Sequence, residues 1–246
     1  MFMAGLMAQR LLAASGLSIV GSESSAYRGT GNFTCNVPTG TASGDLLVCV
    51  VAAPQLGDNN MICNTSGFTE IYDSYVEASD AFFGVNIGIY YQVVSGTPPS
   101  TVSFKGITSQ AENHAQIISI RGADPTTPLS ATIGARSSTV NPPTAAASNT
   151  ATHPANSMML LFHTMFAFYS SGTVSTTVGI SAGATLLQTR QNNYLDRVGG
   201  LTSAYLIKEA AGSFSNLEAG SYTFSDVYGT GTSDGGRNIT LAVYPA

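Results

Sequence analysis

Acidic side chains gather in one stretch where they could take part in chemistry. Asp73, Glu77 and Asp80 lie within the sequence YDSYVEASD. Two carboxylates beside a pocket could carry out glycoside hydrolysis, and three could hold a calcium ion. A solvated loop between two strands would carry the same residues. The stretch is therefore a candidate site that does not by itself identify a reaction.

Other catalytic patterns lack their signatures. No HExxH, CxxC or G-x-S-x-G motif is present, and GTSDGGRN lacks the ending of a phosphate-binding loop. His163 lies within an apolar run and is expected in the core, whereas His153 precedes Pro154 and is expected on the surface. We therefore expect no catalytic residue, no metal and no cofactor, and interpret the protein as not an enzyme.

The composition limits the classes of partner. Charged residues make up 9% of the 246 residues, the net charge is −5, and the only lysines are Lys105 and Lys208. Nucleic-acid binding is not expected, because phosphate contacts need clustered Lys and Arg. No apolar run reaches the roughly 18 residues of a transmembrane helix, so no membrane contact is expected.

Three cysteines, Cys35, Cys49 and Cys63, are too few for a disulfide framework. Cys49 lies in an apolar run and is expected to act as a small hydrophobic side chain. A bridge between Cys35 and Cys63 remains open. An intracellular, reducing site of assembly is the simpler expectation.

Short apolar segments alternate with clusters of Gly, Pro, Asn and Ser after residue 16. The expected strands are 45–53, 85–94, 101–104, 115–122, 158–168, 201–210, 221–224 and 238–245. Many short strands separated by turns predict an all-β sandwich or barrel.

The segments recur in the same order. LSIVGSESS at Leu17 matches LSATIGARSS at Leu129, and SGDLLVCVVAAP (43–54) matches ANSMMLLFHTMFAF (155–168). Three further blocks match in order: GFTEIYDS with GATLLQTR, IYYQVVSGTPPSTVSF with AYLIKEAAGSFSNLEAGSYTF, and IISIRG with ITLAVYP. We interpret this as an internal duplication in which both long apolar runs are central strands.

The expected architecture is all-β, with two tandem jelly-roll-like β-sandwich repeats at 17–128 and 129–246. The Pro-rich turn DPTTP (124–128) marks the boundary, because proline cannot continue a sheet ladder. Whether the repeats share one core stays open at this stage.

Residues 1–16, MFMAGLMAQRLLAASG, are expected to form an N-terminal apolar arm. The spacing of its apolar residues gives one apolar face. Exposed in a free monomer, such an arm would be a liability, so we expect it to pack on the body of the protein or on a partner. The candidate partner-binding residues are Phe2, Leu6, Met7, Leu11 and Leu12.

Aromatic residues flank the acidic stretch. Tyr72, Tyr75 and Phe82 lie beside Asp and Asn residues, where tyrosines of sandwich loops can stack on sugar rings. The same residues could instead be core edges or interface anchors. These three are the candidates for contact with a glycan.

Part of the first repeat resembles β-sandwich repeats of structural proteins of tailed bacteriophages, including capsid decoration and tail-associated proteins. The shared pattern runs, in order, G-D-L-L-V, G-[FW]-T, Y-[YK], T-F, Y-R-G-[VA]-D-P and a final P. The matching residues are Gly44, Asp45, Leu46, Gly67, Phe68, Tyr90, Phe104, Arg121, Gly122, Asp124 and Pro125. The second repeat departs from the pattern: Asn156-Ser157 replaces Gly44-Asp45, and Val243-Tyr244-Pro245 stands in place of Arg121-Gly122.

The resemblance implies a non-enzymatic virion component, assembled in the host cytoplasm. The expected function is capsid decoration or cement, stabilising the head through lattice contacts. The implied partners are the major capsid protein, other virion proteins and further copies of the chain as a homo-oligomer. The alternative is a tail or fibre-associated module that binds a host-surface glycan. A carbohydrate-active enzyme using the acidic stretch is a third reading.

Overall fold

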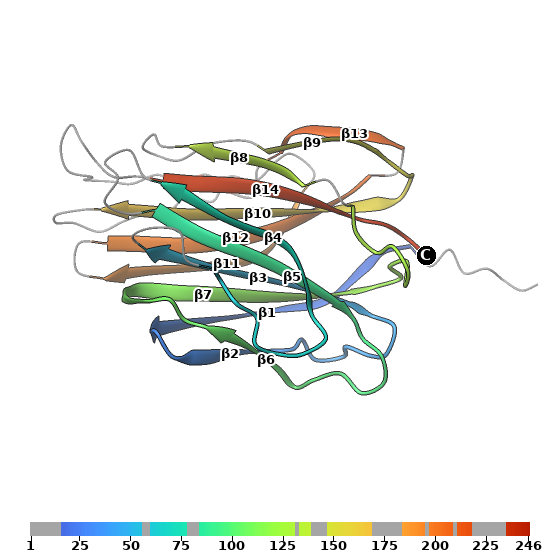
Figure 1. Cartoon of the computed structure of the whole chain (residues 1–246). Helices are drawn as coiled ribbons and strands as arrows, with labels where there is room; N and C mark the ends of the chain where they lie inside the picture. The colour runs from blue at the N-terminus through green and yellow to red at the C-terminus, as the bar shows by residue number, and fades with distance from the viewer. Residues whose placement is uncertain are drawn as a thin grey trace, which may run out of the picture.

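The protein is built from antiparallel β-strands that run along a common axis (Figure 1). The structure, a computed structural model, describes residues 16–55, 60–77, 84–130, 133–138, 147–168, 184–194, 197–208, 211–217 and 235–246. The strands of this described part are β1 (Ser18–Gly29), β2 (Asn32–Asn36), β3 (Leu46–Gln55), β4 (Thr69–Glu77), β5 (Gly84–Val93), β6 (Thr101–Lys105), β7 (Thr108–Arg121), β8 (Gly134–Ser138), β9 (Ala147–His153), β10 (Ser157–Phe168), β11 (Thr185–Tyr194), β12 (Arg197–Lys208), β13 (Gly212–Leu217) and β14 (Gly235–Val243). The predicted all-β class is confirmed.

The strands form two five-stranded sheets and two strand pairs. The first sheet has the order β1-β7-β3-β5-β4 and the second has the order β11-β12-β10-β14-β8, while β2 pairs with β6 and β9 with β13. Read from β8 to β11, the second sheet places the strands of the second half in the same order as the first sheet, read from β1 to β4, places the corresponding strands of the first half. The first half (β1–β7) and the second half (β8–β14) therefore share one topology. Their origin by duplication and their jelly-roll type stay predictions.

The central strand of each sheet is buried on both faces. In β3, the even-numbered side chains from Leu46 to Ala52 lie between the two sheets, and the odd-numbered ones from Leu47 to Ala53 face β2 and β6. Strand β10 divides in the same way into Met158, Leu160 and Phe162 on one face and Met159 and Leu161 on the other. A strand without a solvated face reads as a continuous apolar run. The prediction that both runs are central strands is confirmed.

The two halves share a core. Side chains from β3, β5 and β7 pack between the sheets against side chains from β10, β12 and β14. We call this contact between the two five-stranded sheets the central interface. A second cluster fills the space between the first sheet and the pair β2–β6, and a smaller one covers the far face of the second sheet. The two strand pairs lie at opposite sides of the assembly (Figure 1).

The junction between the halves pairs with the last residues of the chain. Ala123 and Leu129 form isolated β-bridges with Pro245 and Val243. Backbone hydrogen bonds reinforce them, from the Asp124 amide to the Tyr244 carbonyl (3.0 Å) and from the Tyr244 amide to the Pro128 carbonyl (2.9 Å). The Pro-rich turn therefore holds the beginning of the second half against its end.

The segment 221–224, expected as a strand, lies outside the described residues. In the second half, the place that β6 has in the first half is taken by β13, at Gly212–Leu217, which pairs with β9.

Phe162 tests the shared core. Its side chain is fully buried in the central interface, where β10 pairs with both β12 and β14. Phe162→Ala is expected to lower the free energy of unfolding by about 3–5 kcal/mol, because it leaves a cavity between the sheets. Chemical denaturation measures the loss. Leu186→Ala, at a 43% exposed side chain, is the control and should cost well under about 1 kcal/mol. An equal loss in both variants would contradict the shared core.

Candidate functional site

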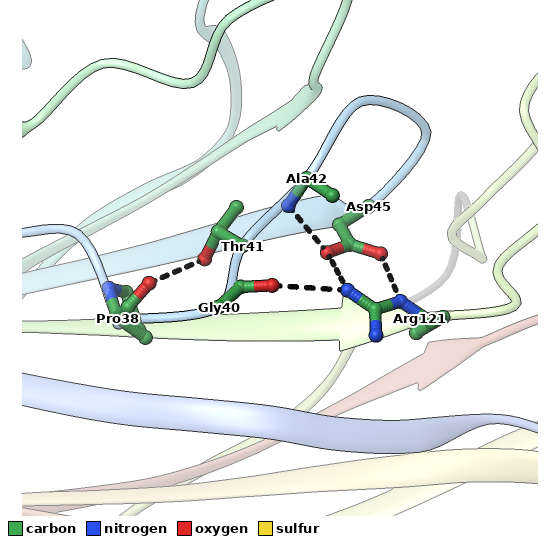
Figure 2. A network of polar contacts seen from close by, with 6 residues as sticks. All are labelled: Pro38, Gly40, Thr41, Ala42, Asp45 and Arg121. Atoms are coloured by element: carbon green, nitrogen blue, oxygen red, sulfur yellow. Dashed lines mark hydrogen bonds and ion pairs between the residues drawn. The ribbon is translucent and has the colours of Figure 1, made fainter.

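The turn that leads into β3 is tied to the end of β7 by an ion pair. The Arg121 guanidinium donates to both carboxylate oxygens of Asp45, from Nε to Oδ1 at 2.9 Å and from Nη2 to Oδ2 at 2.8 Å (Figure 2). The Asp45 side chain is buried, whereas the side chain of Arg121 is 54% exposed. Two parallel hydrogen bonds fix the relative orientation of the two groups as well as their distance. Hydrogen bonding to Asp45 raises the pKa of Arg121.

Further hydrogen bonds order the same turn. The Ala42 amide donates to Oδ2 of Asp45 (2.8 Å), and Nη2 of Arg121 also donates to the Gly40 carbonyl (3.0 Å) (Figure 2). The Thr41 hydroxyl donates to the Pro38 carbonyl (2.7 Å). These contacts compensate the burial of the Asp45 charge. The arrangement orders a turn and leaves one side of a cationic group facing solvent.

The corresponding turn of the second half is ordered by a different hydrogen bond. Asn156 has a φ of 62°, close to the 92° of Gly44. Pro154 stands where Ala42 stands in the first half and has no N–H to offer a carboxylate. Ser157 replaces Asp45, and its hydroxyl donates to the Pro154 carbonyl (2.8 Å). The donor and acceptor roles are thus exchanged together.

His153 lies beside this second turn and corrects an expectation. It was expected on the surface but is 1% exposed. Its ring lies 5.9 Å from the ring of Tyr244, and its Nδ1 is 3.2 Å from the Tyr244 hydroxyl. Packing against a tyrosine more than 90 residues away is not visible in the local sequence, in which Pro154 suggested a loop. The other expectation, a buried His163, is confirmed.

Tyr72, a candidate for glycan contact, is half-buried and contacts the other half of the protein. Its hydroxyl and that of Ser74 both accept hydrogen bonds from Nη1 of Arg237 on β14, and the guanidinium carbon lies 5.9 Å from the centre of the Tyr72 ring. Tyr72 also packs against the core of the central interface. Its ring therefore joins the two halves, and Tyr72 has less freedom to stack on a sugar than the sequence indicated.

The other candidates do not join Tyr72. Tyr75 is half-buried and follows Ser74 on β4, so it lies on the opposite face of the strand. Phe82 lies outside the described residues, as do the arm residues Phe2, Leu6, Met7, Leu11 and Leu12.

The acidic stretch is described only in part. Asp73 lies on β4 and is half-buried, whereas the side chain of Glu77 and the whole of Asp80 lie outside the described residues. Among the residues that the structure describes, no group of three His, Cys, Asp or Glu side chains could hold a metal ion. No helix in the described ranges is long and apolar enough to cross a membrane.

The three cysteines are free thiols in one region of the core. Cys35 and Cys49 are buried and Cys63 is half-buried, all within the cluster between the first sheet and β2–β6. Burial raises the pKa of the Cys35 thiol to about 11. Cys49 acts as a small hydrophobic side chain, as predicted, and the bridge between Cys35 and Cys63 is not formed.

In the sequence, Asp45 and Arg121 stand out only as parts of a shared pattern, and nothing indicates that they pair. They are 76 positions apart, and neither is unusual in its local context.

Comparisons with protein families, curated proteins and solved structures found no match to the chain.

Substitutions at Gly44 test the backbone conformation of the turn, because a side chain there would meet no steric clash and would affect only the backbone. Its φ of 92° disfavours side chains, yet a Cβ atom would meet nothing within 4 Å. Gly44→Asn should cost little, since Asn tolerates this region and Asn156 adopts it in the second half. Gly44→Val should cost at least about 1–2 kcal/mol through backbone strain alone. Thermal unfolding of the two variants measures the difference in stability. Equal losses in both variants would contradict a left-handed backbone conformation at Gly44.

His163 gives the fold a dependence on pH. Burial lowers its pKa to about 4, below its ordinary 6.5, and its Nδ1 lies 3.0 Å from Oδ1 of Asn238. Between pH 6.5 and pH 4, His163 is therefore protonated in the unfolded chain and neutral in the folded chain. Stability should fall by about 1.4 kcal/mol per pH unit for this group as pH drops from 6.5 towards 4.

The His163→Gln variant should lose this share of the slope, measured by denaturation at several pH values. Above pH 7, where histidine is neutral in both states, His163 should contribute no slope. A slope below pH 6.5 that is the same in the variant and the parent would show that His163 is not the titrating group.

Proposed function

We propose that the protein is a non-enzymatic structural component of a virion. Its proposed role is that of a capsid decoration or cement protein that stabilises the head by binding across the lattice of the major capsid protein. Assembly would take place in the host cytoplasm, in agreement with three free thiols. Contacts repeated over symmetric copies would supply the strength of binding.

The observation that carries the proposal is where the shared motif residues lie. Asp45 and Arg121 come from two separate parts of the pattern that the chain shares with structural repeats of tailed phages, and they meet in one bidentate ion pair. Gly44 and Gly122, their neighbours in the pattern, both have φ near 90°. This supports reading the pattern as a fold signature and not as a chance match of short motifs.

The architecture offers surfaces suited to assembly. The edge strands of the first sheet are β1 and β4, and those of the second sheet are β11 and β8. Within the described residues, none of these four strands pairs along its outer edge. An unpaired edge can accept a strand from a neighbouring molecule.

The arm is the first part to remove. The described fold begins at Gly16, and Leu17 is already buried in the central interface, so deletion of residues 1–15 leaves every described strand intact. We expect the truncated protein to unfold at the same temperature as the full chain and to lose binding to capsids stripped of accessory proteins. Co-sedimentation, with the number of bound copies counted per particle, measures the loss.

Binding by the full chain in proportion to the capsid lattice would support decoration. Full binding by the truncated protein would refute the role of the arm. Binding of the full chain at a few copies only, or to tails, would favour the alternative of a tail or fibre-associated module that contacts a host-surface glycan.

Tyr75 is the residue with which to test that alternative. It is on the face of β4 opposite to Tyr72 and Ser74, the two residues that contact Arg237. If the chain binds a glycan there, Tyr75→Ala should reduce adsorption to host cells. Tyr72→Ala is a poor probe, because loss of its contacts with Arg237 and the core should lower the unfolding temperature. Unchanged adsorption of the Tyr75→Ala variant would count against a glycan site on β4.

A further inference from the structure

The central interface changes character along its length. At one end, apolar side chains such as Leu46, Ile120, Met158 and Val243 fill it. Elsewhere hydrogen bonds join the halves: Gln188 Nε2 donates to the Ser22 carbonyl (3.0 Å) between the edge strands β11 and β1, and Gln116 Nε2 donates to the Leu201 carbonyl (2.8 Å) nearer the other end. The contact of Arg237 with Tyr72 and Ser74 is a third polar link. We call this second part the polar seam.

Within the part of the chain that the structure describes, His114 is buried in the polar seam without a hydrogen-bond partner. It lies two residues before Gln116 on β7 and therefore on the same face of the sheet. Its side chain is 1% exposed, and neither ring nitrogen has a hydrogen-bond partner among the described residues. In register on either side are Ala26 of β1 and Ala52 of β3, neither of which can donate or accept through its side chain.

Two other polar atoms of the central interface share this condition. Oε1 of Gln116 and the hydroxyl of Ser203 on β12 are also buried with no partner in the described structure. Ser203 lies between Leu201 and Tyr205, whose side chains belong to the central interface, so it faces the first sheet. The seam therefore contains a group of desolvated polar atoms, which is a weak point in an otherwise packed core.

Burial and a positive charge oppose a proton on the His114 ring. Burial, and after it the charge of Arg190 on β11, lowers the pKa of His114 to about 4. On β7 itself Glu112 lies at the outer end of the seam, under the influence of Arg190 and of Arg28 on β1. The described side chains of β3, from Leu46 to Ala53, add no charge, and Arg197 of β12 has a side chain outside the described residues.

We propose that His114 is an acid-sensitive latch between the halves, whose protonation opens the polar seam while the apolar end of the central interface stays closed. Opening gives the imidazolium access to water, which the closed seam denies it. The three polar links of the seam then exchange their partners for water at small net cost. The described apolar side chains at the other end, Leu46, Ile120, Met158 and Val243, do not titrate and keep the sheets together.

Hydrogen exchange read by mass spectrometry on the full chain tests the proposal. Exchange at pH 7.5 and pH 5.0 is compared after correction for the intrinsic effect of pH. With a pKa of about 4 closed and 6.5 open, the opening equilibrium should rise roughly 30-fold at pH 5.0. The increase should appear in peptides covering Ser22–Arg28 and Gln188–Tyr194, and not in peptides covering the apolar starts of β3 and β10.

Two variants distinguish the latch from general acid sensitivity. His114→Leu fits between two alanines, removes the proton site and should abolish the extra opening at pH 5.0. His114→Gln serves the same purpose if the leucine variant does not fold. His163→Gln is the matched control, because His163 is equally buried but lies on the outer face of the second sheet; it should keep the seam opening.

The proposal is wrong if the seam peptides of the parent protein exchange equally at both pH values. It is also wrong if the His114 variants open as the parent does, or if the apolar end opens together with the seam. This test does not depend on capsid binding, so it stands apart from the proposed function.

Discussion

Burial of β3 and β10 on both faces is the constraint on which the rest of the structure depends. Neither strand has a row of side chains that can face water, so each needs a layer on either side. Stacking the two five-stranded sheets supplies one of these layers to both strands at once. The pair β2–β6 supplies the second layer for β3. The halves are therefore mutually dependent, since separation would expose the largest cluster of buried apolar side chains among the described residues.

Polar contacts decide how the layers and turns are oriented. Apolar burial is strong but has no direction, and two flat faces could slide over one another. Gln116, Gln188 and Arg237 make hydrogen bonds between the sheets that a sliding movement would break. The bidentate contact of Arg121 with Asp45 does the same for the turn before β3. Specificity and stability thus come from different residues.

The parts of the fold that follow from local pattern were predictable, and those that follow from pairing were not. The all-β class and the central positions of β3 and β10 follow from long apolar runs between turns. Strand β11, with the sequence TLLQTRQNNY, has no such signal and is defined by its pairing with β12. Of the candidate residues, Tyr72 has a contact that the sequence did not indicate, because its partner, Arg237, is 165 positions away. Distant contacts leave no mark on a single sequence.

The beginning of β1, the junction between the halves and the last residues meet at one end of the molecule (Figure 1). Ser18 pairs with Arg121, and the Ala246 amide donates to the Gly122 carbonyl (2.9 Å). Anything joined to the chain before residue 16 or after residue 246 would leave from this same end. A tether there would hold the sandwich by its base, with the strands extending away from the point of attachment and His114 towards the far end.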